Sequence, residues 1–267
     1  MSVGEAIVVT SGKGGVGKTT TSANIGTALS LAGKKVCLID TDIGLRNLDV
    51  VMGLENRIIY DLVDVVEGIC KVNQALIKDK RFDHLFLLPA AQTKDKSAVE
   101  PEQMKVLIEE LKQDFDYIVI DCPAGIEQGF KNAIAGADQA IVVTTPEVSA
   151  VRDADRIIGL LEKQEHISPP RLIVNRIRGH MMKNGEMLDV DEIVSILGID
   201  LLGIVVDDDE VIKCANVGEP IALHSTSKAS IAYRNISRRI LGESVPLMSL
   251  NEKAGMFTKI KEFFKVR

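Results

Sequence analysis

The stretch 11–20, SGKGGVGKTT, constrains the fold more than any other part of this chain. It follows the short apolar run 6–10 and leads into a helix-like segment at 19–31, a pattern that predicts strand, loop and helix in succession. Glycines let the backbone N–H groups of such a loop surround an anion, and the positive end of the following helix points at the same place. The pattern G-x-x-x-x-G-K-[ST] therefore predicts a phosphate-binding loop (P-loop) rather than a structural glycine-rich turn.

The residue types of this loop predict a nucleoside triphosphate and Mg²⁺ as cofactors. In a loop of this pattern, Lys18 reaches the β- and γ-phosphates, and the Thr19 hydroxyl is a ligand of Mg²⁺. The other predicted cofactor-binding residues of the loop are Gly14, Gly15, Val16, Gly17 and Thr20.

Length and composition bound the class of protein. The 267 residues, 46% hydrophobic, are within range of one large α/β domain. A net charge of −6 argues against nucleic acid as a partner. The four scattered cysteines favour neither a zinc site nor a disulfide framework, and the sequence contains no apolar run of about 18 residues. We expect a cytoplasmic protein without a signal peptide or a membrane span.

Short apolar runs alternate with segments of helical period along residues 1–242, which we interpret as one domain. Continuous Val/Ile/Leu runs of this kind are typical of strands buried on both faces, so the expected fold is α/β, with a mostly parallel sheet flanked by helices and ligands at the carboxyl ends of the strands. The expected strands are 6–10, 35–39, 84–88, 117–120, 139–144, 171–174 and 201–206. The expected helices are 19–31, 101–113, 128–135, 149–163, 189–197 and 226–241.

Three acidic residues stand at predicted strand ends. Asp40 and Asp42 are two positions apart, so in an extended segment both side chains point to the same side. Asp121 closes the apolar run 117–120 in the manner of a Walker B element, with Mg²⁺-bound water or Thr19 as its expected partner. An Asx turn is the alternative reading of Asp40 and Asp42.

Lys13 extends the loop pattern to K-G-G-x-G-K-[ST], and with it the chain resembles the MinD/ParA family of deviant Walker A ATPases over essentially its whole length. The resemblance implies that Lys13 reaches across an ATP-bound homodimer to the partner's phosphates, where it stabilises transition-state charge together with Lys18. It further implies that Asp42 positions the attacking water, while Asp40, with Thr19 and Asp121, holds Mg²⁺. A solvated loop lysine is the alternative for Lys13.

The resemblance also implies a base pocket. Asn175 and Arg176 match the adenine-recognition element of the family, and an amide offers the donor and the acceptor that adenine requires. The segment Val206, Asp207 and Asp208 corresponds to the wall of the pocket, although relatives usually have proline where this chain has Val206. A β-turn role for Asn175 is the alternative.

The string PEVSAVRDADR, 146–156, begins a predicted helix with Ser149 as a candidate N-cap. Composition alone favours a solvated face with local Asp–Arg pairs. The resemblance instead implies partner binding, with Asp153 as the leading contact for a MinC-like division inhibitor.

The C-terminus is predicted to be a linker, 243–254, followed by an amphipathic helix, 255–267. At about 100° per residue its apolar side chains share one arc, and its flank carries a net charge of +3, which favours an anionic membrane surface. Docking onto the protein's own core is the alternative. The predicted membrane-contacting residues are Met256, Phe257, Ile260, Phe263 and Phe264.

Together these features predict an ATPase that dimerises with ATP, lies peripherally on the inner face of the cell membrane and places the division site by recruiting the inhibitor. A topological regulator of unknown identity is a further expected partner. The alternatives within the same family are a DNA-partitioning ATPase of the ParA type, which needs a basic surface, and a flagellar-number regulator. A redox protein of the nitrogenase iron-protein kind needs a pair of cluster cysteines, which the sequence does not supply.

Overall fold

The computed structural model describes residues 3–224 and 226–248. Within them an eight-stranded sheet has the order β3-β4-β2-β5-β1-β6-β7-β8, and every neighbouring pair is parallel except β3 with β4. The α/β fold expected from the sequence is confirmed. The strands are β1 Glu5–Thr10, β2 Val36–Asp40, β3 Ile77–Lys78, β4 Leu85–Leu88, β5 Tyr117–Asp121, β6 Gln139–Thr144, β7 Arg171–Ile177 and β8 Asp200–Val206.

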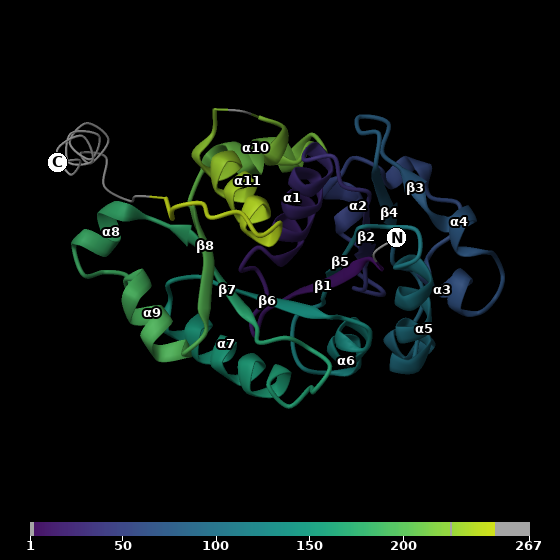
Figure 1. The fold of residues 1–267 in the computed structure, drawn as a ribbon, viewed down its shortest axis with the longest axis horizontal. Coiled ribbons are helices and arrows are strands. Elements are labelled where there is room, and N and C mark those ends of the chain that lie inside the picture. The colour runs from purple at the N-terminus through teal and green to yellow at the C-terminus, as the bar shows by residue number, and fades with distance from the viewer. Residues whose placement is uncertain (1–2, 225, 249–267) are drawn as a thin grey trace, which may run out of the picture.

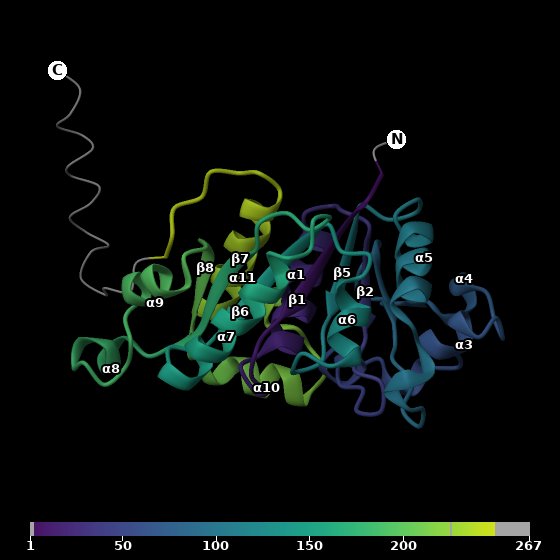
Figure 2. The same cartoon turned by 90° about the horizontal axis from the view of Figure 1, so that it is seen from below.

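Helices cover both faces of the sheet (Figure 1). Helices α1, α10 and α11 lie on one side of the sheet, and α6, α7 and α9 lie on the other; Figure 2 shows α6 and α7 in front of the central strands. The longer helices are α1 Lys18–Leu31, α5 Pro101–Leu111, α6 Gln128–Ile134, α7 Val148–Leu161, α9 Val190–Leu197, α10 Asp209–Asn216 and α11 Lys228–Ile240.

Alternate residues of the central strand β1 belong to two separate hydrophobic cores. Ile7 and Val9 pack in the core beneath α1 and α11, and Ala6 and Val8 pack in the core beneath α5, α6, α7 and α9. All four side chains are fully buried, as period-two alternation within a doubly covered sheet requires. This burial explains why the strand reads as a continuous apolar run.

The predicted strands and helices are present with small shifts at their ends, while several short elements were not predicted. Strand β3 and the short helices contain too few residues to display a hydrophobic period. The short helices are α2 Leu48–Val51, α3 Leu62–Val66, α4 Val72–Ala75 and α8 Gly179–Lys183, with 3-10 turns η1 Glu55–Arg57, η2 Lys96–Ala98 and η3 Ile221–Leu223.

The start of α7 differs from the prediction. The helix begins at Val148 with Glu147 in the N-cap position, so Ser149 lies inside the first turn and is not the N-cap. The Ser149 hydroxyl instead accepts a hydrogen bond of 3.0 Å from Lys13 Nζ. A contact with the P-loop therefore takes the place of the expected cap.

The chain leaves α11 along a path fixed by Arg239. Its guanidinium donates to the carbonyls of Val245 (2.9 Å), Pro246 (2.7 Å) and, on β8, Leu202 (3.0 Å). These contacts hold the described part of the predicted linker, 243–248, against the edge of the sheet. The rest of that linker and the predicted amphipathic helix, 255–267, lie outside the described residues. None of the helices that the structure describes has the length and apolar character needed to cross a bilayer.

Candidate functional site

The P-loop lies at the carboxyl end of the central strand β1 and turns into α1 through left-handed glycines. Gly15 and Gly17 have φ of 77° and 98°, a region in which L side chains are strained. A Cβ on Gly17 would lie 2.4 Å from Asn175 Nδ2, whereas one on Gly15 would meet nothing within 4 Å. The loop is thus packed against β7 on one side and open on the other, as a cradle for phosphate requires.

Lys18 points into this cradle. Its side chain is buried, and Nζ donates a 2.9 Å hydrogen bond to Ser11 Oγ, a partner that the sequence analysis did not identify. Burial lowers the pKa of Lys18, against an opposing effect of the carboxylates of Asp121 and Asp42. A desolvated ammonium that donates to a neutral hydroxyl is a ready partner for an anion. The arrangement fits the predicted contact with β- and γ-phosphates.

Lys13 lies on the outside of the same loop. Its side chain is 41% exposed, and Nζ lies 3.3 Å from Glu147 Oε2 and 3.0 Å from Ser149 Oγ at the start of α7. The two lysines of one motif thus occupy opposite environments, one inside the cradle and one on the surface.

Asp40 and Asp121 form a buried carboxylate pair beside Lys18. They are register neighbours at the ends of β2 and β5. Burial raises the pKa of Asp121 to about 7 and that of Asp40 to about 6, and the charge of Asp40 adds to the rise at Asp121. Hydrogen bonds from Thr19 and Ser22 (Oγ to Oδ1, 2.9 Å) oppose the rise at Asp121.

This donor set fits Mg²⁺ held in part by a bound nucleotide. Among residues 3–224 and 226–248, no group of three or more His, Cys, Asp or Glu side chains is arranged to hold a metal ion. Mg²⁺ in nucleotide sites is usually bound by one or two carboxylates together with hydroxyls, waters and substrate phosphates. Two buried carboxylates with raised pKa values gain most from a cation at this position.

Asp40 also organises the loop that carries Asp42. Its Oδ1 accepts from the backbone N–H of Asp42 (2.9 Å), and its Oδ2 accepts from those of Asn47 (3.1 Å) and Leu48 (3.0 Å) at the start of α2. An Asx-type turn is therefore present at Asp40, as the alternative reading proposed. It places the half-buried Asp42 close enough to Lys18 to affect that lysine's pKa.

The predicted adenine-recognition residues lie beside the P-loop. The buried Asn175 donates from Nδ2 to the carbonyl of Val16 (2.8 Å) and accepts from the N–H of Arg176 (2.9 Å), which leaves one amide hydrogen and one lone pair. Arg176 is exposed, with a left-handed φ of 57°. Sequence alone did not predict that Asn175 would contact the loop.

The predicted pocket wall is held by contacts within the protein. Asp207 pairs with Arg178 at 2.6 Å. Asp208 caps α10 through the N–H of Glu210 (3.0 Å) and accepts from Ser227 Oγ (2.8 Å), next to α11. With these carboxylates engaged and Val206 in the usual place of proline, the segment is suited to backbone or apolar contacts with a base.

Asp153 lies half-buried on α7, directly above the start of the P-loop. A Cβ on Gly12 would lie 2.1 Å from the Asp153 carbonyl oxygen, so the loop and the helix are in backbone contact. The neighbouring charged residues Arg152, Asp155 and Arg156 are exposed. The helix face that carries Asp153 is thereby fixed relative to the phosphate cradle.

Cys122, which follows Asp121, is a buried packing residue. It accepts a hydrogen bond from Thr10 Oγ1 at 3.5 Å, and burial raises the pKa of its thiol to about 12. All four cysteines are free thiols, so the structure contains neither a disulfide nor a thiolate near the cradle.

Comparisons with known proteins agree with this geometry. The model of the CobQ/CobB/MinD/ParA nucleotide binding domain matches residues 7–221. The septum site-determining protein MinD of Bacillus subtilis (strain 168) is 75% identical over 267 residues, which cover 99% of this chain and 100% of that protein.

Two solved structures are similar throughout the fold. The MinC:MinD cell division protein complex of Aquifex aeolicus matches with a TM-score of 0.86 and 51% identity, covering 92% of this chain and 98% of that one. The septum site-determining protein MinD of Pyrococcus horikoshii OT3, complexed with Mg-ADP, matches with a TM-score of 0.80 and 28% identity, covering 88% and 95%. The chain therefore belongs to the CobQ/CobB/MinD/ParA nucleotide-binding family and, within it, to the MinD group of ATPases.

Proposed function

We propose that this protein is an ATP-driven dimerisation switch, which binds the inner membrane surface as a dimer and recruits a MinC-like inhibitor to place the division site. The observation that carries the proposal is the opposite placement of two lysines in one loop. Lys18 is buried in its own cradle, whereas the side chain of Lys13 is 41% exposed and contacts Glu147 and Ser149 at the start of α7. An exposed lysine beside a phosphate loop is suited to reach the nucleotide of a second subunit.

In this proposal each residue of the cradle has a separate task. Lys18 and the backbone N–H groups of 14–20 bind the phosphates, and Asp42 orients the attacking water. Thr19, Asp40 and Asp121 would hold Mg²⁺, which would supply charge neutralisation at the phosphates of a bound nucleotide. Lys13 from the partner subunit adds a charge that is in place only in the dimer, so hydrolysis depends on assembly.

The relatives and the C-terminal segment support the partners that we propose for this protein. The Aquifex aeolicus relative was solved as a complex with MinC, which supports a MinC-like partner here. We assign Asp153 on α7 to that surface, because the N-terminal end of the same helix, at Glu147 and Ser149, contacts Lys13 of the P-loop. The C-terminal segment 255–267 is the proposed membrane anchor, and a topological regulator would act on the dimer.

Trapping of the dimer by Asp42→Ala tests this proposal. The variant keeps the phosphate contacts, so we expect ATP to produce a stable dimer in size-exclusion chromatography with light scattering, while phosphate release falls at least about tenfold. Asp114→Ala, at an exposed aspartate in the turn before β5, is the matched control and should behave as wild type. An Asp42→Ala protein that remains monomeric with ATP, or that releases phosphate at the wild-type rate, would contradict the proposal.

A further inference from the structure

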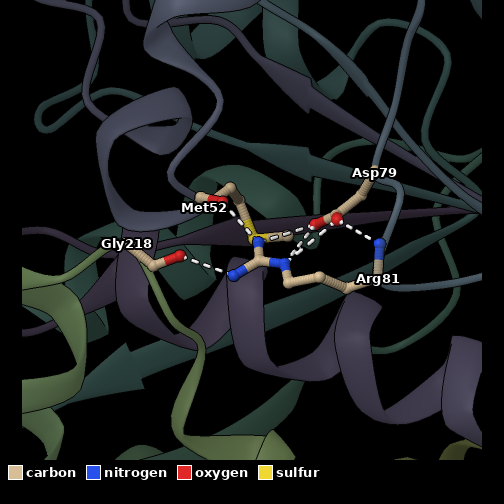
Figure 3. A network of polar contacts seen from close by, with 4 residues as sticks. All are labelled: Met52, Asp79, Arg81 and Gly218. Atoms are coloured by element: carbon tan, nitrogen blue, oxygen red, sulfur yellow. Dashed lines mark hydrogen bonds and ion pairs between the residues drawn. The ribbon is translucent and has the colours of Figure 1, made fainter.

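A buried acidic residue and an arginine form a network at the C-terminal end of α2, where Met52 is the C-cap (Figure 3). Asp79 follows strand β3 and is 2% exposed. Its carboxylate accepts from Arg81 Nε (3.0 and 3.2 Å) and Nη2 (2.7 Å), and also from the backbone N–H of Arg81 (3.0 Å). A forked pair of this kind fixes the plane of the guanidinium as well as its position.

The other edge of the guanidinium holds two carbonyls from distant parts of the chain. Arg81 Nη2 donates to the carbonyl of Met52 and Nη1 to that of Gly218 at 2.8 Å. These two segments also touch directly, because a Cβ on Gly53 would lie 2.8 Å from the Gly218 oxygen and one on Gly218 would lie 2.5 Å from the Gly53 Cα. Both glycines have positive φ, 65° and 69°. The backbones are thus as close as glycine permits, and one arginine joins them.

Each of the two segments leads to a different part of the nucleotide site. Met52 is the C-cap of α2. The backbone N–H groups at the start of α2 donate to Asp40, and this start directly follows the loop that contains Asp42. Gly218 follows α10. The N-cap of α10 is Asp208, which lies at the predicted wall of the base pocket. The Arg81 bridge between the carbonyls of Met52 and Gly218, together with the close approach of Gly53 and Gly218, therefore links the hydrolysis side to the base side of the site.

We propose that Arg81, oriented by Asp79, is a positioning residue that holds the Asp42 loop and the base-side segment 208–218 in register. The inference rests on the proposed ATPase function and adds a residue pair that does not contact the nucleotide. The guanidinium geometry is required, since one planar group must serve two carbonyls and a carboxylate at once, which a lysine ammonium does not reproduce.

Two variants separate positioning from simple loss of stability. Asp79→Asn with Arg81→Met removes both charges together, so no unpaired buried carboxylate is left behind. Arg81→Lys keeps the charge but loses the fork. Arg238→Met is the matched control, because it removes an exposed arginine–glutamate pair of similar length, 2.8 Å to Glu243, from the end of α11.

Hydrogen exchange and kinetics, both on the full-length protein, are the two readouts. In the double variant we expect amide exchange at Asn47 and Leu48 to rise at least about tenfold together with exchange at Gly218 and Glu219, while the amides of β1 keep their protection. Turnover of ATP should fall about ten- to a hundredfold, as expected for displaced reacting groups. In an Asp42→Ala background the same change should cause little further loss of turnover, since its effect passes through Asp42. Arg81→Lys should cause a smaller rise in amide exchange and a smaller loss of turnover, whereas Arg238→Met should change neither.

The outcomes are distinguishable from failure of the proposed function. If wild-type protein did not turn over ATP, the ATP-driven switch would be refuted. Hydrogen exchange alone would then test whether Arg81 holds the two segments in register. The positioning role of Arg81 would be overturned by increased exchange confined to residues 79–85, or by normal turnover in both Arg81 variants. A double variant that does not fold leaves the decision to Arg81→Lys, whose unchanged exchange at Asn47 and Leu48 would also overturn it.

Discussion

The two lysines of the P-loop are the residues whose roles the structure separates most clearly. Lys18→Ala should abolish nucleotide binding, because it removes the only ammonium inside the described cradle. Lys13→Ala should keep ATP binding but lose dimerisation and turnover, because this half-exposed lysine contacts Glu147 and Ser149 outside the cradle of its own subunit. Fluorescent-nucleotide titration and light scattering measure both effects. Normal dimerisation and hydrolysis by Lys13→Ala would return this residue to a solvated loop lysine.

A second prediction at the residue scale concerns the buried carboxylates. The pKa of Asp121 is raised from 3.8 to about 7, so between those values the folded protein binds a proton that the unfolded chain does not. Without Mg²⁺ and nucleotide, the contribution of Asp121 to stability should therefore fall as pH rises through this window. The neutral variant Asp121→Asn should lack that loss. At pH 8 its free energy of unfolding should exceed that of wild type by at most about 4 kcal/mol, because each pKa unit corresponds to about 1.4 kcal/mol.

Urea unfolding at pH 5 and pH 8 measures this difference. Asp114→Asn, at an exposed position, is the control and should follow wild type at both values. Equal stability differences between wild type and Asp121→Asn at the two pH values would contradict the account of the site. Added Mg²⁺ and ATP should restore the stability of wild type at pH 8, because the cation favours the ionised pair.

The sequence predicted those site residues that belong to a recognisable motif. It did not predict the contacts that these residues make with other parts of the chain. Lys18, Thr19 and Asp121 follow from local patterns at the ends of apolar strands. Ser11, whose hydroxyl accepts a hydrogen bond from Lys18, lies one residue before the recognised pattern. The Arg81 network joins residues 52, 79 and 218, and no local period relates these positions, because the contact exists only once the chain is folded.

At the scale of elements, length decided what was predictable. Among the helices of 11–14 residues, α5, α7 and α11 have enough turns and a polar face for a period to appear. Helix α1 is buried on nearly all sides, and its place directly after the P-loop made it predictable. Helix α2 has only four residues; the carboxylate of Asp40 binds the N–H groups at its start, and Leu48 and its C-cap Met52 are buried in the core. Such an element depends on tertiary contacts and leaves little trace in the sequence.

Helix α7 carries the prediction that belongs to this scale. Asp153→Ala should fold, bind ATP and reach the membrane, but should recruit a MinC-like inhibitor weakly, because its side chain has no assigned role in the cradle. Co-sedimentation of the inhibitor with liposomes and ATP measures the effect, and Asp191→Ala on α9, an exposed aspartate at a helix start, is the control. Undiminished recruitment by Asp153→Ala would assign this residue to a solvated helix face.

At the scale of the whole molecule, the described chain ends at residue 248, beside β8 and α8 (Figures 1 and 2). A short amphipathic helix binds a membrane weakly, since each large apolar side chain contributes at most about 1.5–3 kcal/mol and helix formation opposes binding. Two such segments joined in one dimer bind as a bivalent ligand, with avidity about 10² to 10⁴ above that of one segment. Under the proposed function, ATP-dependent dimerisation would therefore act as the membrane switch.

Co-sedimentation with anionic liposomes in ATP and in ADP measures whether dimerisation controls membrane binding. We expect wild type to sediment at least about tenfold more in ATP. Ile260→Glu should fail in both nucleotides, because it places a charge in the apolar arc of the predicted helix, whereas the control Thr258→Glu, outside that arc, should retain most binding. Equal sedimentation of wild type in ATP and ADP would contradict the bivalent switch, and normal sedimentation of Ile260→Glu would contradict the anchor itself.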